Sequence, residues 1–142
     1  MAILILDYER RRAFTLIADA TGVAAGDVVG VDNTGKATKA NGPTAAKQPI
    51  GIAAHAASSG ERVLILPACS IYDDDQSPPW SANVGDRLYL GATGTITLTQ
   101  PGGDNDIVVV LGTAISASKA VIDIQPVPFA VVSGASDTPK YL

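Results

Sequence analysis

The strongest constraint on the fold of this chain is an internal repeat. Residues 23–40 read V-A-A-G-D-V-V-G-V-D-N-T-G-K-A-T-K-A, and residues 82–99 read A-N-V-G-D-R-L-Y-L-G-A-T-G-T-I-T-L-T. The two segments align without a gap, so that Gly26-Asp27 falls on Gly85-Asp86 at an offset of 59 residues. A Thr-Gly pair follows at the same distance in both segments. A fixed offset over several landmarks predicts that one supersecondary unit occurs twice.

The similarity between the two copies continues downstream. P-I-G-I-A at residues 49–53 is similar to V-L-G-T-A at 110–114, and S-G-E-R-V-L-I at 59–65 is similar to A-S-K-A-V-I-D at 117–123. We therefore predict one domain over residues 21–127, with the first copy at about 21–66 and the second copy at about 81–125.

Composition and local pattern indicate that each copy is built from β-strands. Fourteen Gly and nine Pro interrupt the chain every few positions, and Val, Ile and Thr dominate the stretches between them, as in short strands joined by tight turns. Alternation is clearest at residues 95–99, where Ile96 and Leu98 share one face and threonines the other. Each Gly-Asp pair suits a turn, because Gly tolerates a positive φ and Asp accepts hydrogen bonds from backbone amides.

We therefore expect an all-β fold, a small barrel or sandwich made from two tandem pseudo-repeats, in which helices are rare and short. The expected strands lie at residues 28–31, 50–54 and 62–66 in the first copy, and at residues 88–90, 95–99, 107–111 and 120–124 in the second.

Residues 1–20 are expected to form an extended amino-terminal arm outside the repeat. One interpretation makes this segment an added edge strand of its own domain. The other makes it an arm that reaches a neighbouring subunit, where its arginines pair with acidic groups of the partner. The interface residues would then be Ile3, Ile5, Tyr8, Arg10, Arg11 and Arg12.

Two further segments lie outside the repeat. The connector at residues 67–81 contains Asp73-Asp74-Asp75, whose spacing is that of a solvated acidic loop and not of a calcium loop. It also contains the only tryptophan, Trp80, which a proline-stiffened loop can present as a fixed apolar contact or which can plug the end of a barrel. Residues 128–142 are expected to form a carboxy-terminal tail, because Pro128 and Pro139 disfavour a regular central strand.

The sequence contains no group of residues typical of a catalytic or cofactor site. His55 is the only histidine and Cys69 the only cysteine, which excludes a disulfide within the chain and argues against a zinc cluster or a nucleophile–base pair. Gly102-Gly103 is followed by acidic residues and a strand, which is a turn and not a phosphate-binding loop. We therefore predict no enzymatic activity, no cofactor and no metal.

Charge and hydropathy argue against two classes of partner. Ten Lys and Arg against fourteen Asp and Glu leave a net charge of −4, which repels a phosphate backbone. No apolar run approaches the roughly 20 residues of a membrane helix. The arginines at 10–12 follow the apolar start of the chain, the reverse of the order in a signal peptide. We expect no nucleic acid, no membrane and no export signal.

Five motifs in order resemble the capsid cement, or head decoration, proteins of tailed bacteriophages over residues 20–127: V-x-x-G-D-V-V, P-I-G-I-A, S-G-E-x-V-x-I, V-G-D-x-L-Y and V-L-G-T-A. The resemblance implies a compact β-domain that forms a homotrimer. The trimer would bind the major capsid protein on the outer surface of the mature head. It implies a virion location after synthesis in the host cytoplasm, and no catalytic residue. The amino-terminal segment and the loop around Trp80 would then supply contacts between subunits.

Two other functions are left open by the sequence. A biotinyl or lipoyl carrier would use Lys36, although Gly35 and Ala37 flank it where those domains have a Met-Lys-Met or Asp-Lys-Ala context. A carbohydrate-binding β-domain on a virion or cell surface would use Trp80, Tyr72 and the acidic loop as its platform.

Overall fold

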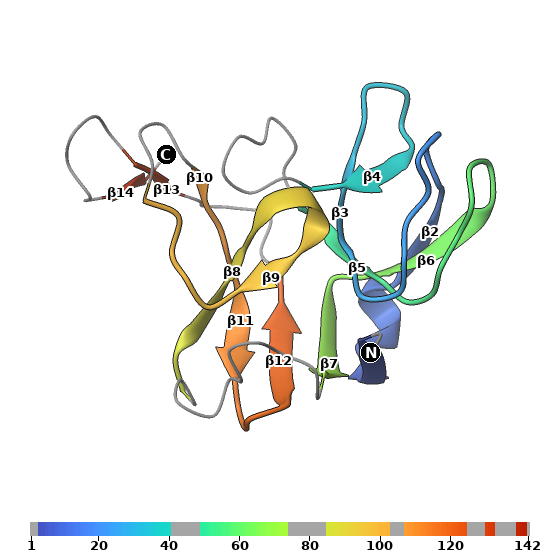
Figure 1. The fold of residues 1–142 in the computed structure, drawn as a ribbon. Helices are drawn as coiled ribbons and strands as arrows, with labels where there is room; N and C mark the ends of the chain where they lie inside the picture. Colours follow the sequence, from blue (N-terminus) through green and yellow to red (C-terminus); the bar gives the residue numbers. More distant parts are fainter. Residues whose placement is uncertain are drawn as a thin grey trace.

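The computed structural model describes residues 3–40, 49–73, 85–102, 107–124, 130–132 and 139–141. The prediction of an all-β fold is confirmed. In the described part of the chain the helical elements are two short 3₁₀ turns, η1 (Arg10–Arg12) and η3 (Ala92–Gly94). The strands form two main antiparallel sheets and a small third one, an arrangement consistent with a β-sandwich and not with a closed barrel (Figure 1).

The first sheet has the order β2-β6-β5-β3-β4, and its strands are β2 (Phe14–Ile17), β3 (Val28–Val31), β4 (Ala37–Lys39), β5 (Gly51–Ala53) and β6 (Arg62–Leu66). The second sheet has the order β1-β7-β12-β11-β8-β9, and its strands are β1 (Leu4–Tyr8), β7 (Ala68–Tyr72), β8 (Arg87–Leu90), β9 (Ile96–Thr97), β11 (Val110–Ala114) and β12 (Lys119–Asp123). The third sheet has the order β10-β13-β14, with β10 (Ile107–Val108), β13 (Ala130–Val132) and β14 (Pro139–Tyr141).

The two main sheets arrange five strands in the same order. The first sheet, which we call the first half, matches β7-β12-β11-β8-β9, which we call the second half. The equivalence extends to single hydrogen bonds. Gly26 donates its N–H to Ala53 over 2.8 Å, and Gly85 donates to Ala114 over 2.8 Å. The repeat read from the sequence thus has a structural counterpart, to which β2 and β7 each add one strand before the repeated segment.

The main hydrophobic core lies between the two sheets. It takes alternate residues of the first sheet, such as Val28, Ile52 and Leu66, and packs them against residues of the second sheet such as Leu88 and Leu111, all with no exposed surface. Burial of each such side chain stabilises the fold by roughly 1.5–3 kcal/mol.

A second core lies on the opposite face of the first sheet. Val29, Ala53 and Ile65, the neighbours of the residues above, point into it. The first sheet curls around this core, so that its edge strands β2 and β4 approach each other. Ala18, the residue after β2, forms an isolated parallel bridge with Ala37 of β4. Strand β3 is therefore buried on both faces, whereas the second sheet faces the main core on one side, and on its other side Tyr89 packs against Val108.

Two glycines at equivalent places show why the strands approach so closely. A Cβ on Gly112 of β11 would overlap the Val121 carbonyl oxygen of the neighbouring strand β12. A Cβ on Gly51 of β5 would lie 2.5 Å from Cγ2 of Ile65 in β6. Neither glycine has the positive φ that favours glycine in turns. The lack of space for a Cβ is therefore the reason for glycine at these two positions.

The structure differs from the expected extended arm at residues 1–20. Strand β1 pairs with β7 at the edge of the second sheet, and β2 pairs with β6 at the edge of the first. Ile3 packs onto the Gly26 turn, where a Cβ on Gly26 would lie 2.5 Å from Cβ of Ile3. The interpretation as an added edge strand of the same domain therefore describes β1, because the alternating apolar residues find a partner within the chain.

Three expected segments also differ in detail. The strand at 107–111 is divided between β10 and β11, which enter different sheets on either side of the buried Val109. The return strand at 95–99 is reduced to Ile96–Thr97. The segment expected to be a tail contributes β13 and β14, and Pro139 lies in β14 at a sheet edge, where a residue without an N–H is tolerated.

Candidate interaction surface

The first candidate contact site is the turn at residues 8–14, which we call the arginine turn. It joins β1 of one sheet to β2 of the other. Glu9 caps the 3₁₀ turn by accepting the Arg11 N–H over 3.2 Å. Arg12 fixes the turn to the end of β12, because it donates to Asp123 Oδ1 over 2.9 Å and to the Ile124 carbonyl over 3.3 Å. The turn therefore has a defined position although its side chains are exposed.

Four side chains of the arginine turn project into solvent. Tyr8 and Phe14 keep 37% and 38% of their surface exposed, which is unusual for aromatic residues in so small a domain. Arg10 and Arg11 are exposed, and neither guanidinium has a hydrogen bond or ion pair within the described residues. Aromatic residues and arginine are the types that carry most binding energy in protein interfaces.

The predicted interface residues of the amino-terminal segment divide into two groups. Ile3 and Ile5 are half-buried and pack against the main core, so they serve the fold of this chain. Their neighbours Leu4 and Leu6 are each 50% exposed. Because the whole run is apolar, the sequence alone did not show which alternate set faces solvent.

The second candidate contact site is the outer face of the second sheet, on the side away from the main core. Its position is clearest in one row of paired residues. Val28 pairs with Ile52, which pairs with Leu66 in the first half. The equivalent row in the second half joins Arg87, Thr113 and Val121 through the pairs Thr113–Arg87 and Thr113–Val121.

The two rows differ completely in burial. The row in the first half is fully buried against the second sheet. The row in the second half is exposed at both ends, with Arg87 accessible to solvent and Val121 44% exposed. No other part of the described chain covers it.

Further apolar residues lie on or beside this outer face. Val110 and Val121 belong to its central strands, and Leu4 and Leu6 belong to its edge strand β1. Beside β1 a shallow hollow of about 280 Å³ is lined by Asp7, Glu9 and Asp123 among others. Sequence analysis did not single out these residues, although the replacement of Val28 by Arg87 in the aligned copies was a signal for them.

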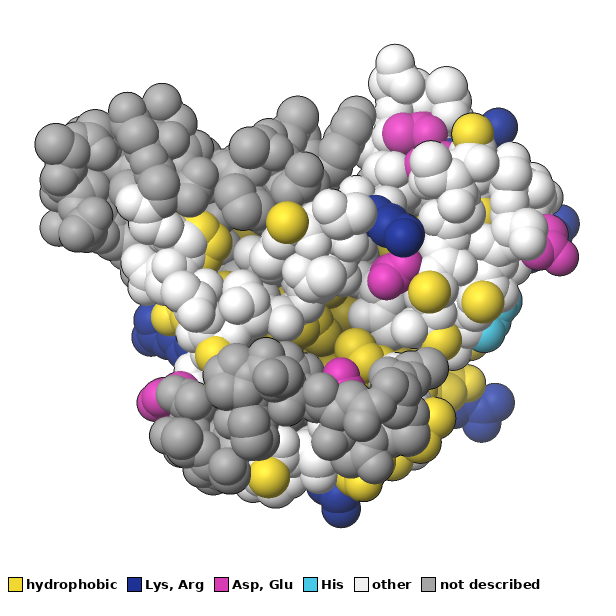
Figure 2. All heavy atoms as spheres, in the orientation of Figure 1, with side chains coloured by type: hydrophobic (Ala, Val, Ile, Leu, Met, Phe, Trp, Pro, Cys, Tyr) yellow, Lys and Arg dark blue, Asp and Glu magenta, His cyan; other side chains and the backbone are white. Residues whose placement is uncertain are grey.

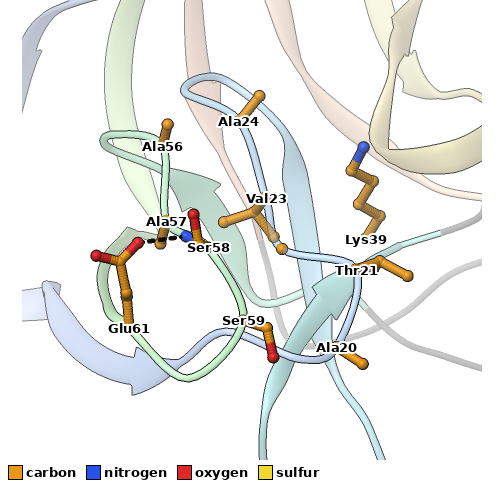
Figure 3. A pocket seen from close by; sticks show the side chains of 11 residues that line it. Ala20, Thr21, Val23, Ala24, Lys39, Ala56, Ala57, Ser58, Ser59 and Glu61 are labelled. Carbon is orange, nitrogen blue, oxygen red and sulfur yellow. Dashed lines mark hydrogen bonds between the residues drawn. The ribbon is translucent and has the colours of Figure 1, made fainter.

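A larger hollow, of about 650 Å³, lies between the loops that precede β3 and β6 (Figure 3). Several of its polar groups are already engaged: the Ser58 N–H donates to Glu61 over 2.6 Å, and Lys39 Nζ lies 3.7 Å from Asp27. Its lining contains no aromatic side chain on which a sugar ring would stack. We find no chemical reason to assign it a ligand.

His55 and Cys69 are held by structural contacts. His55, the only histidine of the sequence, is exposed, in line with the histidine-coloured surface in Figure 2. Its Nδ1 lies 2.9 Å from the Ala56 carbonyl oxygen, and its Nε2 accepts the Leu64 N–H over 3.3 Å. Cys69 lies in the main core, and burial raises the pKa of its thiol to about 12. A thiol with so high a pKa is a poor nucleophile at neutral pH.

Other groups named from the sequence have these places. Trp80, Asp74 and Asp75 lie outside the described residues. Tyr72 is half-buried at the end of β7, and Lys36 is exposed after the turn between β3 and β4. Among the described residues there is no cluster of three His, Cys, Asp or Glu side chains that would hold a metal ion. Over the same residues no helix is long and apolar enough to cross a membrane.

Comparison with known proteins adds no relative to this picture. No protein-family model matches the chain, and no curated protein matches it.

Proposed function

We propose that this protein is a capsid decoration, or cement, protein that binds the outer surface of a mature phage head and reinforces it by bridging capsid subunits. The arginine turn is the observation that carries the proposal. It presents two aromatic side chains, and two arginines that have no partner among the described residues, from a fixed position between two sheets. A surface of this composition is suited to a protein partner with acidic groups.

The fold suits a mechanical task. Two sheets share one continuous core, and the first sheet also encloses its own, so the domain resists deformation of its loops relative to one another. A protein that binds the expanded shell and not the unexpanded one stabilises the expanded shell by mass action. The homotrimer implied by the sequence resemblance would add avidity, because three linked copies bind with a high effective concentration.

The test is binding to expanded capsid shells that lack the decoration protein, measured by cosedimentation. The double substitution Arg10→Glu/Arg11→Glu reverses both unpaired charges of the arginine turn. It is expected to weaken binding by roughly tenfold or more, because charge complementarity at an interface is replaced by repulsion. Arg62→Glu is the matched control, since Arg62 is also exposed but lies on β6 of the first half.

The proposal is supported if the wild type and Arg62→Glu bind the shells and the Arg10→Glu/Arg11→Glu variant does not. Equal binding of that variant and the wild type would remove the arginine turn from the contact. Failure of the wild-type chain to bind any expanded shell would remove the function itself.

A further inference from the structure

We propose that the outer face of the second sheet is the surface through which copies of this chain join one another, with Arg87 of one copy meeting Asp7 of the next. This deepens the proposed function, because it locates the contact that a homotrimer needs. Three observations lead to it: the internal precedent, the charge distribution along one row of the sheet, and the exposed Val121 between the charges.

The internal precedent comes from the first half. The face of the first sheet that carries Val28, Ile52 and Leu66 is the one that faces the main core, where it is buried against the second sheet. The equivalent face of the second half holds Arg87, Thr113 and Val121 and is uncovered by the described chain. The same structural unit therefore already uses this face for sheet packing once in the molecule. Val121, at 44% exposure, leaves apolar surface available on this face.

The charges on this face are arranged to complement a second copy. One row of pairs crosses five strands, from Arg87 through Thr113, Val121 and Ser70 to Asp7. The cation and the carboxylate thus lie at opposite ends of the row. A second copy placed with its Arg87 end against the Asp7 end of the first forms a heterologous contact, and heterologous contacts close into rings when the rotation allows.

Both charged groups are available for such a contact. Arg87 is exposed, and its guanidinium has no hydrogen bond or ion pair within the described residues. Asp7 uses Oδ1 to accept the Tyr8 N–H over 2.8 Å, and no described group bonds its other oxygen. The hollow of about 280 Å³ beside Asp7 also presents the carboxylate of Glu9, and that of Asp123, which is already paired with Arg12.

The edge strand β1 carries a bulge that disfavours pairing with a strand from another copy. Leu6 and Asp7 both lie opposite Ser70, because the register shifts between Ile5 and Asp7. This bulge and the Asp7 carboxylate on the Tyr8 N–H interrupt the row of free backbone groups, which is how proteins block edge-to-edge pairing. Association through the face of the sheet beside Asp7, where Leu6 is exposed, does not use the backbone groups of that edge.

A charge-swap experiment tests the contact in the full chain. The mass of the wild-type protein is measured by sedimentation velocity over a range of concentrations, beside Arg87→Glu, Asp7→Arg and the double substitution. The wild type is expected to self-associate. Each single substitution is expected to weaken association at least about tenfold, and the double substitution to restore it to within about threefold, because the pair is re-formed with its signs exchanged.

A milder pair guards against misfolding, since Asp7→Arg removes the acceptor of the Tyr8 N–H. Asp7→Asn keeps an oxygen at that place. The fold-change in the association constant of the Asp7→Asn/Arg87→Gln double variant should be less than the product of the fold-changes of the two single variants. Arg62→Glu, on the first half, is the control and should leave association unchanged. Additive effects of Asp7→Asn and Arg87→Gln, or a wild type that stays monomeric at every concentration, would overturn the proposal.

The outcome is separable from that of the capsid proposal. Arg10→Glu/Arg11→Glu should self-associate like the wild type, because the arginine turn lies outside the Arg87–Asp7 row. If Arg87→Glu associates normally but no longer binds capsid shells, the outer face contacts the shell and the assignment to a second copy is wrong. If association depends on the Arg87–Asp7 pair and no shell is bound, the contact stands and the capsid function fails.

Discussion

The two halves of this protein use the same strand order to produce different surfaces. In the first half, the sheet curls until Ala18 meets Ala37, and its central strand β3 is buried on both faces. In the second half, β1 extends the sheet and the outer face is left open. The comparison teaches that the hydrogen-bonded framework sets the fold, and that a few positions on one face decide whether that face serves as core or as a contact surface.

The largest effect is expected from exchanging residues between the two equivalent rows. Val28→Arg places a charge with no partner in the main core and should destabilise the protein by about 4 kcal/mol or more. Arg87→Val, the reverse exchange, should change the unfolding free energy by less than about 1 kcal/mol, because Arg87 is exposed. Chemical denaturation of both variants checks this. Similar losses of unfolding free energy in the two variants would contradict the claim that one row is buried and the other exposed.

The next effect concerns the glycines that allow close strand approach. Gly112→Ala should cost about 2–3 kcal/mol, because its methyl group overlaps backbone atoms of β12, which cannot move aside. Gly51→Ala should cost less, since its nearest contact is the side chain of Ile65. Gly102→Ala, with nothing within 4 Å, is the control. Thermal unfolding that ranks Gly51→Ala as the more damaging variant would contradict the account of the two halves.

A smaller effect is expected from the link that fixes the arginine turn to the second half. Arg12 and Asp123 keep 41% and 51% of their side-chain surface exposed, so the pair should contribute about 0.2–1 kcal/mol. A double-mutant cycle with Arg12→Gln and Asp123→Asn measures the coupling, which should decrease as salt is added. A coupling energy near zero would mean that the Ile124 carbonyl, and not Asp123, holds Arg12 in place.

The smallest effect is acid sensitivity confined to the first half. The Lys36 N–H, the Thr34 hydroxyl and the Thr34 N–H bond the Asp32 carboxylate and hold its pKa below the ordinary value of 3.8. A lowered pKa in the folded state stabilises the protein above pH 3.8, and that contribution is lost as the pH falls through the folded-state pKa.

The second half has Gly91 at the position equivalent to Asp32, so it has no such carboxylate. The unfolding free energies of the wild type and of Asp32→Asn should therefore converge as the pH falls below 3.8. Carboxyl chemical shifts followed by NMR give the titration directly. An Asp32 midpoint at or above 3.8 would contradict the hydrogen-bonding account.

The sequence predicted the fold class because turn residues and β-branched runs are local signals. It predicted β6 at residues 62–66 with the bounds that the structure has. It did not predict the partner of β1, because pairing with β7 joins residues far apart in the chain.

Since β1 belongs to the sheet and Ile3 and Ile5 pack on the core, deleting residues 1–12 would damage the fold, and substitution of surface residues is the sounder test.

The candidate surfaces were only partly predictable. Tyr8 and the arginines were named from their types, and the structure leaves Tyr8, Arg10 and Arg11 exposed. Leu4, Leu6 and Val121 were not named, because exposure of an apolar residue depends on which face of a strand meets the core. Only the sheet register showed that Arg87 and Val121 occupy the places of Val28 and Leu66.

The most direct test of the account is hydroxyl-radical footprinting of the protein free in dilute solution and bound to expanded capsid shells. We predict that protection on binding falls on Tyr8 and Phe14 of the arginine turn and on Leu6 and Val121 of the outer face, while Val31 of the first half, now 36% exposed, reacts equally in both states. Protection of Val31 with unchanged reactivity at Tyr8 and Val121 would contradict the claim that the second half and the turn beside it form the contact surface.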